Sequence, residues 1–267
     1  MTRAKRSLSQ NFLVDPNLQR KIVDALEADA GDVVLEVGAG HGELSRHLVG
    51  GVADLVLVEK DDRLVGELRE RWGHRDDVRV VHADALEVDL GTLVPDGRRF
   101  RVLSNLPYAV TSPLLFRFLA LDPAPERIVV TVQKEVAERI AAEPGSGDFG
   151  SLTVGVQARA RARVAFDVSR HAFRPEPDVE SATVVIEPDP ERIRALPAEP
   201  LRRLTRAAFS RRRKQLQTIL RTAPAYGLAR EAAEAVCAEL GVDPRIRPER
   251  LSPGQFVELA RRLEEVR

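Results

Sequence analysis

Cysteine and long apolar runs are both scarce in this sequence. Its single cysteine, Cys237, cannot form a disulfide within the chain, which indicates a reducing cytoplasm. No apolar run approaches the roughly 20 residues that a membrane-spanning helix needs. The first residues are basic and no apolar segment follows them, so we expect no secretory signal. These absences favour a cytoplasmic globular protein and exclude a disulfide-stapled or membrane-spanning one.

The chain also lacks an excess of either charge. Its 41 lysines and arginines balance 41 aspartates and glutamates, for a formal net charge of zero. RNA-binding proteins are usually basic overall, so this total argues mildly against an RNA partner, although the distribution of charge matters more than the sum. The five histidines show no metal-ligand spacing, and we therefore expect no metal.

The order of the expected elements indicates two domains. Short β-branched runs alternate with amphipathic stretches in the first part of the chain, which is typical of an α/β domain with a largely parallel sheet. Residues 188–200 are rich in proline, and the pattern beyond them is helical. We predict an α/β domain at residues 1–190 and a small helical domain at residues 198–267. The expected strands are 33–37, 54–59, 78–82, 101–104, 127–132, 152–157 and 182–186, and the expected helices are one ending near 49, then 61–72, 112–121, 200–208, 211–221, 229–240 and 253–266.

A glycine-rich turn follows the first expected strand. Gly38, Gly40 and Gly42 let the backbone turn tightly and let a ligand approach without an intervening Cβ. About 20 residues later Glu59 ends the next strand, where its carboxylate could accept hydrogen bonds from two ribose hydroxyls. The spacing is Gly-x-Gly-x-Gly rather than the Gly-x-Gly-x-x-Gly that holds a pyrophosphate. It therefore favours a nucleoside ligand without phosphates.

A second acidic residue stands at the end of the third expected strand. Asp84, with Ala85 beside it, is placed to accept a hydrogen bond from an adenine amine. Ligand-facing groups at three successive strand ends are what a parallel sheet predicts for a bound nucleoside. Taken alone, the glycine turn also fits a different ligand or none.

The segment Asn105-Leu106-Pro107-Tyr108 follows the fourth expected strand and suits chemistry on an adenine amine. That amine is a poor nucleophile because its lone pair is delocalised into the ring. Two acceptors, the Asn105 side-chain oxygen and the Leu106 carbonyl, could favour the tetrahedral nitrogen that attacks a methyl donor. Pro107 would hold the turn rigid, and the Tyr108 ring could stack on an extruded base. The alternative is a plain strand-ending turn.

Phe173 is a candidate for the opposite wall of the same adenine pocket. It stands between His171 and Pro175. A phenylalanine in the hydrophobic core is nearly as compatible with this pattern.

Together these motifs resemble the ribosomal RNA adenine dimethyltransferase family over nearly the whole chain. The resemblance implies a Rossmann-like domain that uses S-adenosylmethionine, with Gly38, Glu59, Asp84 and Asn105 at its cofactor positions. The segment Ser-Gln-Asn-Phe-Leu-Val-Asp at residues 9–15 matches the family's opening motif. That match implies that two of its residues touch the cofactor, namely Asn11 and Leu13. Further similar segments are residues 133–139, 144–146, 173–177 and 208–214.

Within the family, residues 144–146 and 247–252 favour the enzymes that dimethylate two adjacent adenines near the 3′ end of small-subunit (16S) RNA during ribosome biogenesis. Ser9 replaces a frequent glycine, as in the large-subunit (23S) enzymes of the macrolide-resistance type, which are the alternative. Ala39 and His41 also depart from the family's usual residues. A non-catalytic assembly factor with the same fold is a further alternative, and the intact segment 105–108 argues against it. A nicotinamide-dependent oxidoreductase would need Gly-x-Gly-x-x-Gly.

A basic cluster opens the expected helix at 211–221. If Ser210 caps that helix, four cations stand in its first turn and oppose the helix dipole. This local cost indicates an anionic partner, for which RNA phosphate is the natural choice, and the alternative is a solvated charged face. We expect a monomer that binds ribosomal RNA or the immature small subunit. The expected RNA-binding residues are Arg202, Arg203, Arg206, Arg211, Arg212, Arg213 and Lys214, with Arg3, Lys5 and Arg6 as an extension.

Overall fold

The structure is a computed structural model that describes residues 11–95 and 97–266. Over these ranges the chain forms two compact units, residues 11–137 with 161–188 and residues 138–160 with 189–266. The second unit thus includes residues 138–160, which the sequence analysis assigns to the α/β domain. None of the helices in the described ranges is long and apolar enough to cross a membrane. Arg3, Lys5, Arg6, Ser9 and Gln10 lie outside the described residues.

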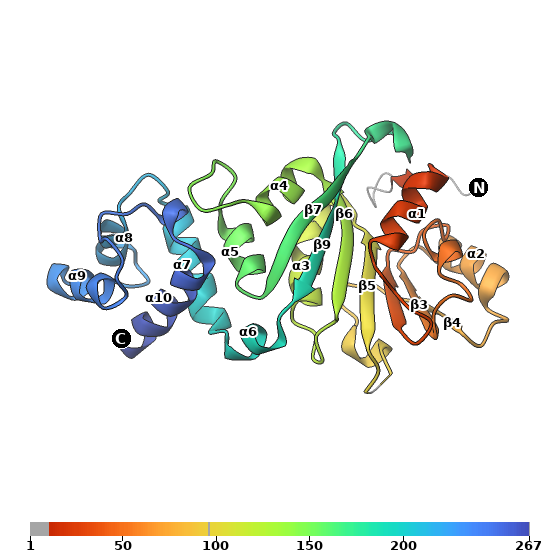
Figure 1. Ribbon diagram of the computed structural model, residues 1–267, viewed down its shortest axis with the longest axis horizontal. Helices are drawn as coiled ribbons and strands as arrows, with labels where there is room; N and C mark the ends of the chain where they lie inside the picture. Colours follow the sequence, from red (N-terminus) through yellow and green to blue (C-terminus); the bar gives the residue numbers. More distant parts are fainter. Residues whose placement is uncertain (1–10, 96, 267) are drawn as a thin grey trace. The chain divides into compact units, whose positions relative to one another are not determined.

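The first unit is built on a mostly parallel sheet (Figure 1). In the described chain its strands, in sheet order, are β4 (Val78–His82), β3 (Asp54–Glu59), β2 (Val33–Val37), β5 (Phe100–Asn105), β6 (Arg127–Gln133), β9 (Ser181–Pro188) and β7 (Ala160–Val168). β2 pairs in parallel with both β3 and β5, whereas β9 runs antiparallel to β6. The predicted α/β class with a largely parallel sheet is confirmed. Strand order reverses between β2 and β5, and that reversal opens a crevice at their carboxyl ends.

Helices cover this sheet and leave its central strands fully buried. All five residues of β2 are buried, as expected for a parallel strand that is covered on both faces. α2 (Asp62–Trp72) begins where the Asp61 carboxylate accepts a hydrogen bond from the Arg63 backbone, and it packs against β3 and β4. The remaining elements of this unit are α1 (Pro16–Asp24), α3 (Thr111–Phe118), the short antiparallel pair β1 (Phe12–Leu13) and β8 (Phe173–Arg174), and the start of α4 (Lys134–Ala141).

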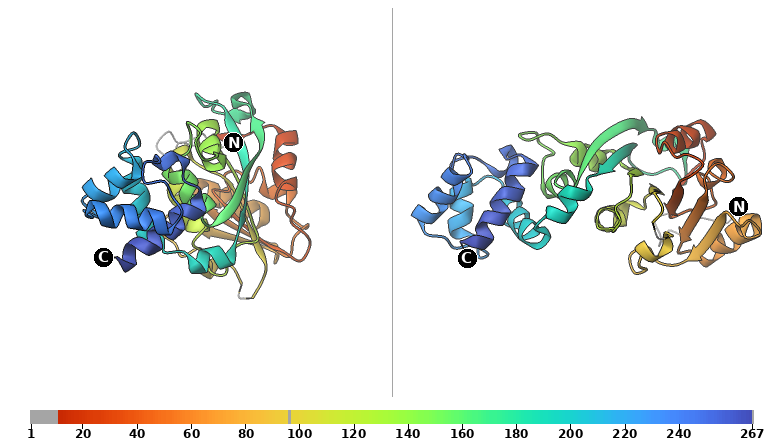
Figure 2. Two further views of the ribbon diagram at one scale, coloured as in Figure 1. Left: turned by 60° about the vertical axis from the view of Figure 1, so that its left-hand side comes forward. Right: turned by 60° about the horizontal axis from the view of Figure 1, so that its bottom comes forward.

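The second unit is a bundle of helices around its own core (Figure 2). Its helices are α5 (Ser151–Gln157), α6 (Pro190–Ala195), α7 (Ala198–Phe209), α8 (Leu216–Thr222), α9 (Arg230–Glu239) and α10 (Pro253–Glu265). α10 packs against α5, α7 and α9, and the rings of Phe209 and Phe256 stack with centroids 5.5 Å apart. Cys237 is fully buried in this core, and burial raises the pKa of its thiol to about 11. The thiol is therefore a small core group that stays protonated.

The strand expected at residues 152–157 is wrong, because this segment forms helix α5. Residues 153–156 are all buried, so the hydrophobic pattern carries no period that separates helix from strand. The helix is anchored by Thr153, whose hydroxyl accepts a hydrogen bond from the Gly150 backbone and donates one to the Arg139 carbonyl. α5 packs against α7 and α10, which explains why residues 138–160 join the helical unit.

The helix expected at residues 211–221 is present only in its second half, and its predicted start is wrong. α7 continues to Phe209, Ser210 is its C-cap, and α8 begins only at Leu216. The four cations therefore follow the C-terminal end of α7, where the helix dipole favours positive charge rather than opposing it. The helix expected to end near residue 49 is only a 3-10 turn, Ser45–His47.

A buried carboxylate ties together the amino-terminal ends of the central strands. Asp32 is fully buried, and its oxygens accept hydrogen bonds from Arg101 Nε at 2.7 Å, Arg99 at 3.0 Å and the Asp29 backbone at 3.0 Å. Burial raises the pKa of Asp32, but the hydrogen bonds from the Asp29 backbone and Arg101 outweigh it and leave the pKa below its usual value. The folded protein therefore holds Asp32 as a charged group.

We predict that Asp32→Asn destabilises the protein by about 3 kcal/mol at neutral pH, because it removes the buried charge that faces the largely buried Arg101 guanidinium and leaves Glu126, at 3.3 Å, as the remaining ion-pair partner of Arg101 among the described residues. Since the folded pKa is lowered, the contribution of Asp32 is present above the unfolded pKa of about 4 and is lost as pH falls through the folded value. Urea unfolding of both proteins from pH 7 to pH 3 should show the difference in unfolding free energy narrowing. Asp54→Asn, which alters an exposed pair with Arg98, is the control and should cost under about 1 kcal/mol. A pH-independent difference would contradict the assignment.

Candidate active site

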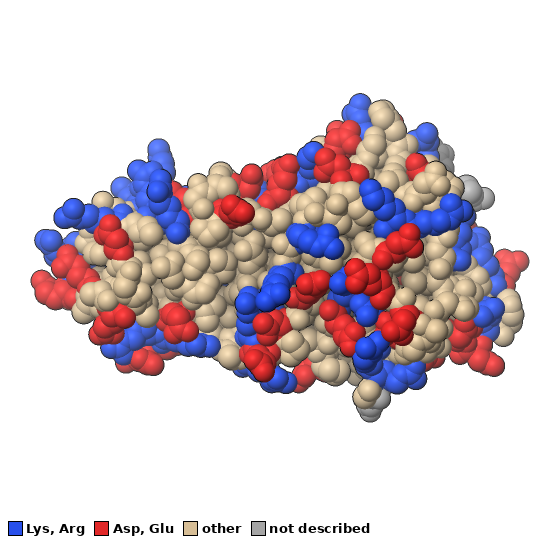
Figure 3. Space-filling view, viewed as in Figure 1, with Lys and Arg blue, Asp and Glu red and all other residues tan. Residues whose placement is uncertain are grey.

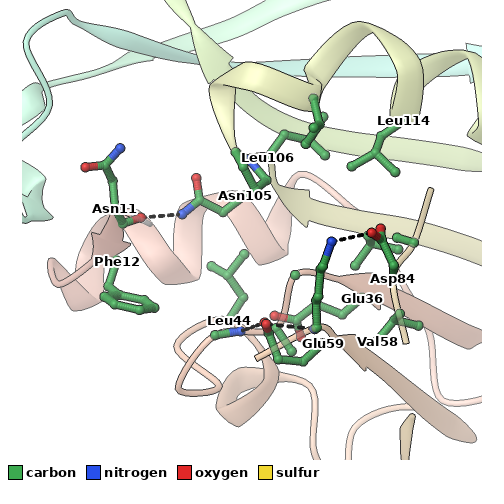
Figure 4. Close-up of a pocket in the computed structure, with 18 of the residues that line it drawn as sticks. Asn11, Phe12, Glu36, Leu44, Val58, Glu59, Asp84, Asn105, Leu106 and Leu114 are labelled. Atoms are coloured by element: carbon green, nitrogen blue, oxygen red, sulfur yellow. Dashed lines mark hydrogen bonds and ion pairs between the residues drawn. The ribbon is translucent and has the colours of Figure 1, made fainter. Parts of the chain in front are cut away.

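A cavity of about 280 Å³ lies at the carboxyl ends of β2, β3 and β5, within the first unit (Figure 4). The crevice between β2 and β5 predicts a ligand site at this place. Most of the predicted cofactor and catalytic residues line it, namely Asn11, Leu13, Gly38, Gly40, Glu59, Asp84, Ala85, Asn105, Leu106, Pro107 and Tyr108. Segments that are far apart in the chain are thus brought to one cavity.

The glycines of the turn after β2 have different roles. Gly38, Gly40 and Gly42 all have positive φ, at 74°, 61° and 80°, which other residues rarely adopt. A Cβ at Gly38 would have no neighbour closer than 3.9 Å, so this glycine leaves room in the cavity. A Cβ at Gly42 would lie 2.5 Å from the Trp72 ring. Gly42 is therefore needed for packing against α2, whereas Gly38 and Gly40 border the cavity.

Glu59 links the glycine turn to the end of β3. Its carboxylate accepts hydrogen bonds from the backbone nitrogens of Gly40 at 3.0 Å and of Lys60 and Asp61 at 2.8 Å each. A carboxylate has about four acceptor positions, so the described residues leave one on the oxygen that faces Gly40. Glu59 is thus fixed in place and can still accept one hydrogen bond from a ligand hydroxyl.

Asp84 forms an ion pair that sequence reasoning did not find. Lys60 Nζ lies 2.5 Å from one carboxylate oxygen, and the Leu86 backbone donates to the other at 2.9 Å. The hydrogen bond from Lys60 is the main reason that the pKa of Asp84 is lowered. Each oxygen retains a second lone pair, so Asp84 remains an acceptor on the wall of the cavity.

Two further glutamates, Glu36 and Glu43, line the cavity and were not predicted as site residues. Glu36 is buried, accepts a hydrogen bond from Ser45 Oγ at 2.6 Å, and lies near Glu43 and Glu59. Burial raises the pKa of Glu36 to about 8, and the neighbouring carboxylates add to the effect. Glu36 is therefore largely protonated at neutral pH, and in that form its carboxyl group can donate as well as accept a hydrogen bond. Glu36 could have been predicted from the sequence, because it stands two residues before Gly38, the first glycine of the turn.

The segment Asn105–Tyr108 is held in place by its neighbours. The Asn105 side-chain amide donates to the Asn11 carbonyl at 3.1 Å, and the Leu106 backbone nitrogen donates to the Thr131 carbonyl at 3.1 Å. Among the hydrogen bonds between described residues, none uses the Asn105 side-chain oxygen or the Leu106 carbonyl. The two acceptors predicted for an adenine amine are therefore both available (Figure 4).

Tyr108 is half-buried, and its hydroxyl lies 2.7 Å from Ser181 Oγ. Burial raises the pKa of Tyr108, so the phenol stays neutral at ordinary pH. A neutral, hydrogen-bonded phenol is poorly suited to accept a proton. This arrangement favours the ring, rather than the hydroxyl, as the working part of the side chain.

Phe173 does not line the cavity. Its side chain is 1% exposed and belongs to the hydrophobic core with Leu13, Ile22 and Val129. Leu13 stands opposite Phe173 in the pairing of β1 with β8, and both side chains belong to the same core cluster. The expectation that it walls the adenine pocket is therefore corrected to the alternative, a core residue. Besides Tyr108, Phe12 also lines the cavity, and its ring centroid lies 4.5 Å from that of His41.

With this geometry in place, comparison with known proteins identifies the family. A model of the family "Ribosomal RNA adenine dimethylase" matches residues 1–265. The chain belongs to this family.

Relatives within the family are similar over almost their full length. The chain is 39% identical to "Ribosomal RNA small subunit methyltransferase A" of Pseudomonas aeruginosa, over 99% of this chain and 96% of the relative. It is 41% identical to the protein of the same name from Rhodospirillum rubrum, over 98% of this chain and 88% of the relative. The predicted resemblance is confirmed.

Solved structures confirm the Rossmann-like methyltransferase fold. A dimethyladenosine transferase from Plasmodium falciparum has a TM-score of 0.83 at 24% identity and covers 95% of this chain and 98% of its own. The 23S rRNA methyltransferase ErmE has a TM-score of 0.70 at 27% identity and covers 95% of this chain and 100% of its own.

The predicted RNA-binding residues of the second unit fall into two groups. Arg202 and Arg203 pair with Glu199 and Glu264 at 2.7 and 2.8 Å. Arg211 donates to Thr222 Oγ1 at 2.7 Å, and Arg212 donates to the carbonyls of Ser146 and Gly147. In contrast, three exposed members have no ion pair within the described chain, namely Arg206, Arg213 and Lys214. In Figure 3, basic side chains gather over α7 and α8.

Proposed function

We propose that this protein transfers methyl groups from S-adenosylmethionine to the N6 amines of two adjacent adenines near the 3′ end of small-subunit (16S) ribosomal RNA. The reaction takes place in the cytoplasm, on a monomeric enzyme, during biogenesis of the small subunit. The observation that carries the proposal is the pair of available acceptors at Asn105 and Leu106, in a chain that belongs to the adenine dimethylase family. The relatives named for the small subunit favour it over the large-subunit alternative.

The residues around the cavity fit S-adenosylmethionine. The remaining acceptor position of Glu59 suits a ribose hydroxyl, and Asp84 suits the adenine amine, with Ala85 beside it. Glu36 and Glu43 also line the cavity, where their carboxyl oxygens can accept hydrogen bonds from the amino group of the methionine part. Asn11, Leu13, Gly38 and Gly40 would border the same ligand. When bound, the cofactor supplies the electrophilic methyl group on a sulfonium sulfur.

The acceptors in the segment 105–108 would activate the target amine. The Asn105 side-chain oxygen and the Leu106 carbonyl accept hydrogen bonds from its two hydrogens, which draws the nitrogen toward a tetrahedral geometry. Because the acceptors are already held by the hydrogen bonds to Asn11 and Thr131, little reorganisation is needed as charge develops. Tyr108 stacks on the extruded adenine, and Pro107 keeps the turn rigid. No strong general base is required, since the methylated nitrogen loses its proton readily.

The proposed function predicts that the purified protein transfers labelled methyl groups to immature small subunits, and that the label maps to two adjacent adenines. Naked large-subunit RNA in a parallel reaction tests the alternative target. If only the large-subunit RNA became labelled, that RNA would be the substrate and the proposed small-subunit target would be wrong. Absence of transfer to either RNA, with cofactor binding intact by calorimetry, would favour the non-catalytic assembly factor.

For Asn105→Ala we predict a loss of turnover that exceeds any loss of RNA affinity. The acceptor matters most in the transition state, so its removal should cost on the order of 3 kcal/mol, about a hundredfold in rate. Single-turnover rates and RNA binding measured on the same variant separate the two effects. Asn17→Ala, an exposed amide on α1, is the control and should keep full activity. Equal losses in affinity and rate would show that Asn105 contributes only binding.

The basic cluster should supply part of the RNA affinity despite the neutral total charge. Replacing Arg206, Arg213 and Lys214 together by glutamine should weaken RNA binding and flatten its salt dependence by up to about three phosphate contacts. The matched control is Arg202→Gln with Arg203→Gln, because these cations already face glutamates and should change the slope less. If the salt dependence of RNA binding is unchanged in the triple variant, these three cations form a solvated charged face and do not contact RNA.

A further inference from the structure

The Tyr108 ring is attached to the sheet through its hydroxyl. Tyr108 stands in the 3-10 turn Tyr108–Val110 that follows the strand end, and its hydroxyl is 2.7 Å from Ser181 Oγ. Ser181 is the first residue of β9 and is fully buried. The hydrogen bond therefore joins the hydroxyl end of an aromatic side chain to a fixed point in the sheet.

Ser181 has little freedom to follow the ring. It stands opposite Gln133 in the antiparallel pairing of β9 with β6, and the neighbouring Glu180 carbonyl accepts a hydrogen bond from the Lys134 backbone at 2.9 Å. Within the described chain, Ser181 Oγ forms its hydrogen bond with the Tyr108 hydroxyl. A buried hydroxyl left without that partner would be costly, so the pairing persists.

Both ends of the segment 105–108 are thus anchored to the same pair of strands. The Leu106 backbone nitrogen donates to the Thr131 carbonyl of β6, and the Tyr108 hydroxyl meets Ser181 of β9. The first anchor fixes the acceptors that face the amine. The second fixes the position of the hydroxyl end of the ring and thereby the Tyr108 χ1 torsion, about which the ring would otherwise swing.

We infer that Ser181 is a positioning residue, whose hydroxyl holds the Tyr108 ring at the place where the target adenine stacks. The inference rests on the proposed function, because the adenine is what the ring would contact. Ser181 itself does not line the cavity and takes no part in the chemistry. Its effect passes entirely through Tyr108.

A double-mutant cycle tests this role with the full-length protein. Ser181→Ala and Tyr108→Phe should each lower the single-turnover methylation rate about tenfold, the scale of one neutral hydrogen bond, and the double variant should be no slower than either. Cofactor affinity should be unchanged. Small-subunit RNA with 2-aminopurine at the target position reports base stacking without methyl transfer. The fluorescence of the bound RNA should differ from its value with the wild type, and by the same amount in the two single variants and the double variant.

Thr183→Val is the matched control, because it removes another buried hydroxyl of β9 that pairs with Thr131 instead of Tyr108. It should leave the rate and the fluorescence as in the wild type. Ser181→Cys replaces the hydroxyl by a slightly larger thiol, which is a weaker hydrogen-bonding group, and it serves if the alanine variant is unstable. The inference would be overturned if the rate losses of the two single variants multiplied in the double variant. It would also be overturned if a Ser181 variant changed only the thermal stability of the protein. A wild type that neither methylates the RNA nor alters the 2-aminopurine signal would instead overturn the proposed function.

Discussion

The parallel pairing of β2 with both β3 and β5 decides where the functional groups of this protein meet. Because the strand order reverses at this point, the chain leaves β2 and β5 in opposite directions, which opens a crevice between them. The glycine turn after β2, Glu59 after β3 and Asn105 after β5 all open onto that crevice. The site is thus a consequence of sheet topology, and the side chains only determine what it binds.

Most polar atoms of the site residues already form hydrogen bonds within the protein. Three backbone nitrogens satisfy most of the Glu59 carboxylate, and the Asn105 amide donates to Asn11. The hydroxyl of Tyr108 is paired with Ser181. What remains is a small set of acceptors in fixed positions. Such preorganisation is the main means by which an enzyme can stabilise developing charge without reorganising during the reaction.

The neutral total charge hides a division between paired and unpaired cations. In the first unit Asp32 holds Arg99 and Arg101, and in the second unit Glu199 and Glu264 hold Arg202 and Arg203. These pairs serve the fold and cancel in the sum. The exposed cations beyond them, at the end of α7, are the ones that suit phosphate. Composition alone therefore underestimated the case for an RNA partner.

The local sequence determined the strands that line the site, the glycine turn, the acidic strand ends and the segment 105–108, because each depends on short-range spacing and side-chain type. Tertiary packing decided the features that depend on distant partners. Residues 153–156 are all buried and helix α5 packs against α7 and α10, so the segment lacks the hydrophobic periodicity that would have distinguished a helix from the expected strand. Phe173 entered the core because β8 pairs with β1, a contact across 160 residues of chain. The Lys60–Asp84 and Tyr108–Ser181 contacts likewise join separate strands, and only the folded sheet brings them within reach.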